Sequence, residues 1–188
     1  MRKNFGGKPW LYPMPVLIVA TYDENGNPDA MNAAWGGIYS DDKIGICLSE
    51  THKTTQNIFQ TKAFTVSMGT VSQMTACDFV GLVSGKKVPN KFEKSGFHAI
   101  KSSNVNAPII EELPMTLECE FVSYDKESNF MVGKIVNVSA EESILSTDGK
   151  IDPSKLQPIL FDPCNHHYLK VGEKAGDAFS EGKKLIKA

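Results

Sequence analysis

The fold is decided by PVLIVATYDENGNPDAMNAAWGG, residues 15–37 of the chain. Its first part, Pro15 to Tyr22, is an apolar, β-branched run typical of a strand buried on both faces. The residues from Asp23 to Pro28 then concentrate turn-forming chemistry, and Asn25-Gly26 suits the positive φ angles of a hairpin turn. Asp29 to Trp35 can return as the second strand. We therefore expect an antiparallel hairpin at this point of the chain.

Further strand candidates follow at close spacing. They are Lys43 to Leu48, Ala63 to Met68, a strand around Leu117 to Phe121, and Phe130 to Val138, the last two joined by a hairpin over Tyr124 to Asn129. In the last candidate Val132, Val136 and Val138 share one parity, which predicts one packed face. Helical periods long enough for crossover helices are few. The pattern favours a mostly antiparallel barrel or sandwich over a doubly wound sheet.

Length and composition are those of one globular domain covering residues 1–188, with 41% hydrophobic and 22% charged residues. A formal net charge of -2 gives no electrostatic case for a nucleic-acid partner. The longest strongly apolar run, Val16 to Ala20, is far shorter than the roughly 20 residues that span a bilayer. The N-terminus also lacks the apolar region of a signal peptide. We expect a cytoplasmic protein with no membrane partner.

The cysteines argue against a zinc ribbon or a thioredoxin motif, because they are spread singly with no Cys-x-x-Cys pair. They are Cys47, Cys77, Cys119 and Cys164, and we expect reduced thiols. Cys164 clusters with His166 and His167, so a metal site could begin there, but every further ligand would have to come from a distant segment. A polar C-terminal strand is the preferred interpretation, and no metal is predicted.

A first candidate binding segment is SETHKTTQNI, residues 49–58. Its hydroxyl groups, the cation of Lys53 and the free backbone N–H groups at a predicted helix start suit a phosphate. The hydroxyls belong to Ser49, Thr51, Thr54 and Thr55. The alternative is a surface helix for which Thr51 to Thr55 offers the N-cap.

Two more segments allow a functional and a structural interpretation. In MNAAWGG, residues 31–37, small side chains around Trp35 would let a flat ligand approach the backbone. The alternative is that a barrel corner at this point requires small residues. In SGKKVPNKF, residues 84–92, the lysines Lys86, Lys87 and Lys91 are typical of a solvated loop. A functional role for one of them follows only if other evidence indicates a flavin. A cation near the pyrimidine end of a reduced flavin would stabilise its negative charge.

Together these segments resemble the flavin reductase-like, FMN-binding split-barrel family, and most closely its flavoredoxin branch. The matching motifs are YPMPVLIVATYDENGNPDAMNAAWGG, then a strand, THKTTQNI, AFTVS and SGKKVPNKF, in that order. The similarity extends over nearly the whole chain, including the terminal HHYLKVGEKAGDAFSEGK. Several motifs in the right order and spacing argue against coincidence.

The resemblance implies a six-stranded antiparallel Greek-key split barrel with a few short helices. It also implies a homodimer with sites near the subunit interface, and FMN bound without a covalent link. By this similarity the flavin ring is lined by Asn32, Ala33, Ala34 and Trp35. The ribityl phosphate is held by Ser49, Thr51, His52, Lys53, Thr54 and Thr55, Asn57 anchors the following helix, and Ser84, Gly85, Lys86 and Lys91 approach the ring more loosely. Many members of the family place an Arg where this chain has Lys53, which keeps the charge and loses the planar fork.

The expected function is that of an FMN-binding oxidoreductase in which the flavin performs the chemistry, so no catalytic residue is named. The expected electron donor is either NAD(P)H, as in a flavin reductase, or a redox protein partner, as for a flavoredoxin-like carrier. His166, His167 and Tyr168 are candidates for the open face of the flavin. The alternative from another class is a non-catalytic barrel that binds a small ligand or serves as a dimeric interaction module.

Overall fold

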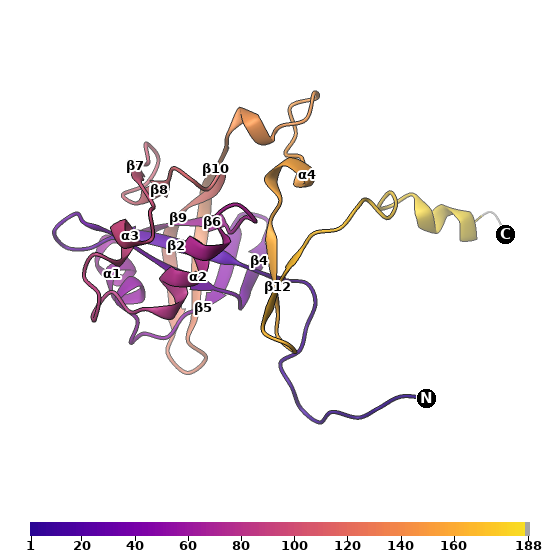
Figure 1. Ribbon diagram of the computed structural model, residues 1–188, viewed down its shortest axis with the longest axis horizontal. Helices are drawn as coiled ribbons and strands as arrows, with labels where there is room; N and C mark the ends of the chain where they lie inside the picture. The colour runs from indigo at the N-terminus through magenta and orange to yellow at the C-terminus, as the bar shows by residue number, and fades with distance from the viewer. Residues whose placement is uncertain (187–188) are drawn as a thin grey trace.

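One seven-stranded antiparallel sheet forms the body of the computed structural model, which describes residues 1–186 (Figure 1). Its strands in chain order are β2 (Leu17–Tyr22), β3 (Pro28–Ala33), β4 (Gly36–Ser40), β5 (Lys43–Cys47), β6 (Ala63–Met68), β9 (Met115–Asp125) and β10 (Phe130–Ala140). Across the sheet they follow the order β3-β2-β6-β9-β10-β5-β4. Every neighbouring pair is antiparallel, as the sequence predicts.

The sheet is closed at the corner between β3 and β4. These two strands lie at opposite edges of the sheet, although only Ala34 and Trp35 separate them in the chain. The edges must therefore curl toward each other. The Cys47 N–H donates to the Trp35 carbonyl at 2.8 Å, which extends the pairing of β4 with β5 up to the corner. Counted as one strand with a bend, β3 and β4 reduce the seven strands to the six of the predicted barrel. The predicted split-barrel fold is confirmed.

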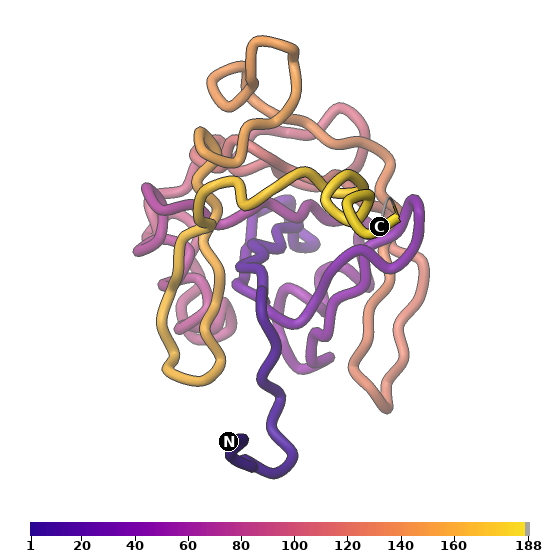
Figure 2. Tube along the Cα trace, turned by 90° about the vertical axis from the view of Figure 1, so that its right-hand side faces the viewer, coloured from indigo at the N-terminus to yellow at the C-terminus, as the bar shows by residue number. Residues whose placement is uncertain are grey.

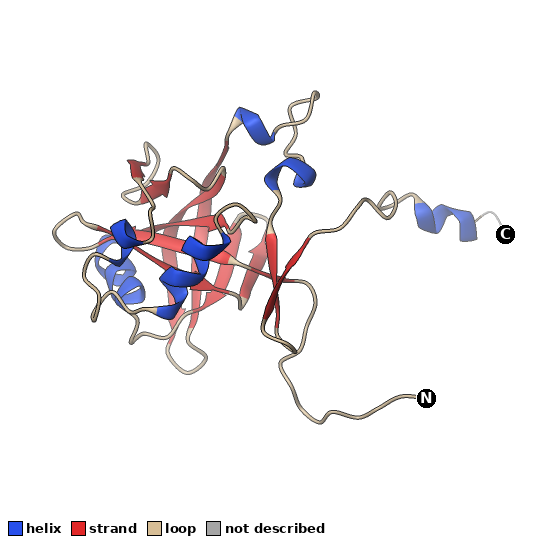
Figure 3. Cartoon of the chain, in the orientation of Figure 1, coloured by secondary structure: helices blue, strands red, loops and turns tan. Residues whose placement is uncertain are grey.

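Smaller elements surround this barrel. A second sheet joins β1 (Met14–Pro15), β11 (Ile159–Asp162) and β12 (His167–Lys170), and a hairpin joins β7 (Ala99–Lys101) to β8 (Pro108–Ile110). The helices are α1 (Lys53–Thr61), α2 (Met74–Leu82), α3 (Lys91–Lys94) and α4 (Pro153–Leu156), with 3-10 turns η1 (Glu142–Ile144) and η2 (Glu181–Leu185). Figure 3 shows α1, α2 and α3 gathered on one side of the strands. The predicted short helices are confirmed.

Strand β2 is buried on both faces, as its unbroken apolar run predicts. Leu17 and Val19 point into the barrel core beside Ile58 of α1. Ile18 and Ala20 belong to a second cluster with α2 and α3. Helices α2 and α3 therefore cover the outer face of β2 and β3, which places the loop between them next to the barrel corner.

Two local details of the sequence interpretation are wrong. In the β2–β3 turn, Gly26 takes a positive φ of 81° and Asn25 does not. The Asp23 carboxylate shapes this turn by accepting the N–H groups of Asn25 and Asn27 at 2.9 Å. In β10 the register against β9 shifts between Ile135 and Asn137. Val132 is buried whereas Val136 and Val138 are exposed, so the three valines do not form one packed face.

The chain ends and the cysteines complete the description. Both ends extend from the barrel on the side of β12 (Figure 1), and Figure 2 shows the N-terminal segment running away from the body. The four cysteines are free thiols, as expected. Within residues 1–186, no helix has both the length and the apolar composition that crossing a membrane requires.

Glu118 on β9 is a buried acid that the sequence pattern does not explain. Its carboxylate accepts hydrogen bonds from Ser102, from Asn104 Nδ2 at 3.1 Å and from Asn137 Nδ2 at 2.6 Å. Burial raises the pKa of Glu118, but the hydrogen bonds outweigh burial and hold the pKa below its usual range. The ionised carboxylate therefore ties β9, β10 and the loop after β7 together.

We expect Glu118→Gln to lower the free energy of unfolding at pH 7 by about 1–3 kcal/mol, because an amide cannot accept all of these donors. A carboxyl whose pKa is depressed by folding stabilises above its unfolded pKa, near 4.5, and this stabilisation is lost as the pH falls toward the folded pKa. The difference between wild type and variant should therefore shrink from pH 7 to pH 3 in urea unfolding. Glu120→Gln, at an exposed position of the same strand, is the control. A Glu118→Gln effect that does not change with pH would contradict this assignment.

Candidate functional site

Two pockets meet at the end of β3. The first, here called the corner pocket, has a volume of about 660 Å³ and includes Asn32, Ala33, Ala34 and Trp35 in its wall. The second, the cation pocket, has a volume of about 230 Å³ and includes Lys53, Thr54, Ser84, Gly85 and Lys91. Met31, Asn32 and His52 line both pockets, so the two form one continuous site. Three sequence segments that the resemblance singles out, MNAAW, THKT and the SGKKVPNKF loop, are therefore brought together.

The corner pocket contains the four residues predicted to line the flavin ring. They come from the barrel corner itself, so MNAAWGG turns the corner and also lines a pocket. Ser49 and His52 enter from the loop before α1, Asn129 from the β9–β10 turn, and Phe161 from β11. The Tyr124 hydroxyl, which contacts the Leu48 carbonyl at 2.8 Å and Asn129 Oδ1 at 3.0 Å, joins two of these walls. Asn129 and Phe161 were missed by the sequence analysis.

Helix α1 presents its N-terminus to the cation pocket. Its N-cap is His52, and among the described residues no side chain makes a capping hydrogen bond there and no acidic residue occupies the first turn. The N-cap lies within the predicted range Thr51 to Thr55, at a residue whose side chain makes no capping hydrogen bond. Because the first-turn N–H groups keep their capacity to donate, and the helix dipole is positive at this end, the arrangement suits an anion.

Cationic side chains surround this helix start. Lys53 Nζ lies 3.6 Å from Asp23 Oδ2, and Lys86 Nζ donates to the Thr51 carbonyl at 2.8 Å. Burial lowers the pKa of His52, and the charges of Lys91 and Lys86 lower it further. An anion bound here would meet Lys53, which is paired with Asp23, and Lys86, which bonds only a backbone carbonyl.

A buried network lies under the cation pocket. Lys91 Nζ is 3.5 Å from Asp29 Oδ1, and Thr54 Oγ1 donates to Asp29 Oδ2 at 2.6 Å. All three side chains are buried. Burial lowers the pKa of Lys91, and the charge of Asp29 opposes this change. Asp29 thus links β3 to α1 and α3. In the sequence it is a single acidic residue after a turn, and that pattern does not predict this role.

The remaining residues of the predicted phosphate segment lie behind the pocket walls or beside them. The Ser49 and Thr51 hydroxyls are 2.9 Å apart, and Lys86 follows the Ser84-Gly85 wall. Thr55 and Asn57 are buried in α1. Within residues 1–186, Thr55 Oγ1 and Asn57 Nδ2 have no hydrogen-bond partner. An unpartnered buried hydroxyl in the first turn of α1 is compatible with a missing polar ligand.

The C-terminal candidates separate into different environments. The ring of His166 stacks on Phe161 with centroids 6.2 Å apart, so it lies behind a wall of the corner pocket. His167 is exposed, and Tyr168 lines a neighbouring pocket. In the described part of the chain, the metal-compatible cluster is formed by His98, Glu111 and Glu112, not by Cys164 and its neighbouring histidines.

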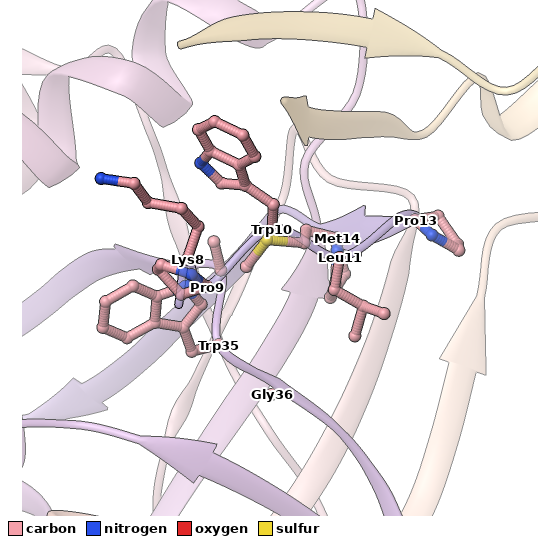
Figure 4. A pocket seen from close by; sticks show the side chains of 10 residues that line it. Lys8, Pro9, Trp10, Leu11, Pro13, Met14, Trp35 and Gly36 are labelled. Carbon is pink, nitrogen blue, oxygen red and sulfur yellow. The ribbon is translucent and has the colours of Figure 1, made fainter. Parts of the chain in front are cut away.

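A third pocket adjoins the corner on the side of the N-terminal segment. It has a volume of about 480 Å³ and is lined by residues 8–11 and 13–15 together with Ala34, Trp35 and Gly36. Figure 4 shows the side chains of Lys8, Trp10 and Trp35 around it. Trp35 therefore belongs to two pockets, and its side chain is still 57% exposed.

Comparison with known proteins agrees with this geometry. The flavoredoxin of Desulfovibrio vulgaris (Miyazaki F) matches with a TM-score of 0.93 and 33% identity over 97% of this chain and 100% of that one. The flavoredoxin of Methanosarcina acetivorans matches with a TM-score of 0.87 and 29% identity over 98% and 99% of the two chains. An uncharacterized protein of Archaeoglobus fulgidus is 27% identical over 76% of this chain and 80% of its own length. The model of the flavin reductase like domain matches residues 10–162, and the chain therefore belongs to the flavin reductase-like family.

Proposed function

We propose that the protein binds FMN without a covalent link and transfers electrons through it. Membership of the family supports a flavin cofactor and a redox role. The observation that carries the proposal is the junction of the two pockets at His52, where a mainly apolar cavity meets a helix N-terminus surrounded by lysines. This combination matches a flat ring joined to a phosphate.

The residues present fit the two ends of FMN. In the proposed complex, Ala33 and Ala34 give the ring access to backbone groups and Trp35 covers part of it, while the N–H groups of α1 and Lys53 hold the phosphate. Lys91 stays paired with Asp29, and this buried ion pair holds the wall of the cation pocket in place. Bound FMN would supply electron and hydride exchange, and the protein would position it and limit its contact with water.

The purified protein should be yellow and should release FMN rather than FAD on denaturation. The reason is that the cation pocket is small and the chain has no dinucleotide-binding fingerprint. Chromatography of the released ligand is the measurement. Recovery of FAD alone would contradict the assignment of FMN, and failure of the colourless protein to take up added FMN would favour a non-catalytic barrel.

The electron donor separates two activities. The match to two flavoredoxins over nearly the whole chain supports a carrier that exchanges electrons with a redox protein partner. The alternative is a reductase that oxidises NAD(P)H. Steady-state oxidation of NADH and of NADPH, with free FMN or a protein acceptor present, distinguishes them: turnover with either nucleotide favours the reductase, and none favours the carrier.

We further propose that a second copy of the chain covers the corner pocket. Trp35, Ile38 and Tyr39 follow one another along the corner and β4 and are 57%, 71% and 60% exposed, beside the equally exposed N-terminal segment. An apolar surface of this kind next to a ligand pocket is typical of an interface. A homodimer would bury it and enclose the flavin ring.

If the second copy completes the site, FMN must favour association, because a ligand that binds the dimer more tightly shifts the equilibrium toward it. Sedimentation at decreasing protein concentration, with and without saturating FMN, should show a dimer that dissociates at lower concentration when FMN is present. Ile38→Lys should weaken association, whereas Ile100→Lys, exposed on β7, should not. A monomer that binds FMN with unchanged affinity would contradict the shared site.

A further inference from the structure

An imidazole and two carboxylates meet at the β7–β8 hairpin, outside the corner and cation pockets. They belong to His98, Glu111 and Glu112, and one ligand atom from each lies within 4.8 Å of the other two. His98 directly precedes β7 and Glu111 directly follows β8. Because the two strands are antiparallel with Ala99 opposite Ile110, His98 and Glu111 face each other at the open end of the hairpin. The topology thus brings together side chains from two separate strands.

The backbone around this cluster is fixed on both sides. The Glu111 N–H donates to the His98 carbonyl at 3.0 Å, which extends the pairing of the two strands by one position. Phe97, Ile110 and Leu113, which flank the cluster in the chain, are buried in the core beneath α2 and α3. The three side chains can therefore converge on one point with little further loss of backbone freedom.

Glu112 is already oriented toward the imidazole. Its Oε2 accepts the His98 backbone N–H at 3.0 Å, and its Oε1 lies 2.5 Å from His98 Nδ1. The Glu112 side chain is 21% exposed, whereas that of His98 is 75% exposed, so the cluster opens to solvent on the imidazole side. A backbone hydrogen bond that orients a carboxylate is a common feature of metal sites.

The negative charge of the cluster is not balanced by a lysine or an arginine. Within residues 1–186, the ion pair that involves either glutamate is the one between Glu112 and His98. Ligands that bind zinc tetrahedrally at about 2.0–2.2 Å lie about 3.3–3.6 Å from one another. Side-chain shifts of roughly an ångström would therefore convert the observed arrangement into three metal ligands.

We propose that His98, Glu111 and Glu112 bind a divalent transition-metal ion such as zinc, with water completing its coordination. An imidazole nitrogen and carboxylate oxygens are ligands that zinc takes in proteins. Calcium and magnesium prefer oxygen ligands, so the imidazole selects against them. A bound ion would join the residue before β7 to the residues after β8 and would stabilise the hairpin. This site lies outside the flavin pockets and goes beyond the proposed function.

The test begins with calorimetric titration of the purified full chain with zinc chloride, which should show one ion bound per chain. Glu111→Gln is the central variant, because Glu111 is exposed and makes no ion pair within residues 1–186. It should weaken zinc binding at least about tenfold without lowering the unfolding midpoint of the zinc-free protein. Glu93→Gln, at an exposed position of α3, is the matched control and should leave the zinc affinity unchanged.

The location of the ion is tested with histidine variants and NMR. His98→Ala should weaken zinc binding at least as strongly as Glu111→Gln, whereas His167→Ala, which removes an exposed imidazole near Cys164, should not. Zinc should shift the ring resonances of His98 and slow amide hydrogen exchange in β7 and β8. The slower exchange should be absent in Glu111→Gln.

Three results would overturn the proposal. They are zinc binding that neither Glu111→Gln nor His98→Ala weakens, loss of binding in His167→Ala instead, and displacement of zinc by an equal concentration of calcium, which would indicate general attraction of cations to exposed acids. Flavin content is read separately from visible absorbance. A yellow protein that binds no zinc would contradict only the metal site, and a colourless protein that binds zinc and takes up no FMN would contradict only the proposed function.

Discussion

Lys91→Met should lower the free energy of unfolding by about 3–5 kcal/mol, because it leaves the buried Asp29 carboxylate without its cation. The two groups lie 3.5 Å apart and both side chains are almost fully buried. The remaining bond from Thr54 cannot neutralise the charge. Urea unfolding at pH 7, followed by circular dichroism, measures the loss. It should be accompanied by weaker FMN binding, since Lys91 lines the cation pocket.

The double variant Asp29→Asn with Lys91→Met is the control for this prediction. Removing both charges abolishes the uncompensated carboxylate, so the double variant should be more stable than Lys91→Met alone and should recover a large part of the loss. Lys87→Met, in the same loop but outside the pocket wall, should change stability little. If the ion pair were not the reason for the loss, the effects of Asp29→Asn and Lys91→Met would simply add. A double variant that is less stable than Lys91→Met by the full effect of Asp29→Asn would therefore contradict the prediction.

Lys53→Ala should weaken FMN binding about tenfold to a hundredfold, because a charge-assisted contact to a phosphate contributes about 1.5–3 kcal/mol. The same variant should cost little stability. In the free protein Lys53 lies 3.6 Å from Asp23 at a partly exposed position, and the Asp23 carboxylate keeps its hydrogen bonds from Asn25 and Asn27 when Lys53 is removed. Titration of the colourless protein with FMN, followed by flavin fluorescence, gives the dissociation constants.

Riboflavin separates the phosphate contact from other effects of Lys53. It lacks the phosphate, so it should bind wild type and Lys53→Ala almost equally. Lys87→Ala removes a charge from the neighbouring loop without touching the pocket wall and should affect neither ligand strongly. A similar loss of both flavins in Lys53→Ala would show that Lys53 acts through the fold or the ring, and the phosphate would then have to lie elsewhere.

The sequence by itself determined the elements whose pattern is local. The apolar run of β2 is unbroken, so it predicts a strand with both faces buried. The turn residues after it predict a strand that returns antiparallel to β2. The resemblance added the barrel and the segments that line the corner and cation pockets. The confirmed fold follows from these local patterns and their order along the chain.

Local sequence pattern does not predict which valines of β10 are buried or which residue caps α1. Val136 and Val138 are exposed while Val132 is buried, although their spacing favours one packed face. His52 became the N-cap although hydroxyl residues stand beside it. Both outcomes depend on how neighbouring strands and loops meet, and alternation or cap preference within one segment does not contain that information.

Only the tertiary structure decided which distant residues meet at the site. Asp29 is structurally important because Lys91 pairs with it and Thr54 donates a hydrogen bond to it. Phe161 and Asn129 line the corner pocket because β11 and the β9–β10 turn lie next to the barrel corner. The pairing of Asp78 with Tyr168 joins residues 90 positions apart in the chain. Secondary structure is encoded in short-range periodicity, whereas these contacts arise from closing the sheet on itself, and a single sequence carries no local signal for them.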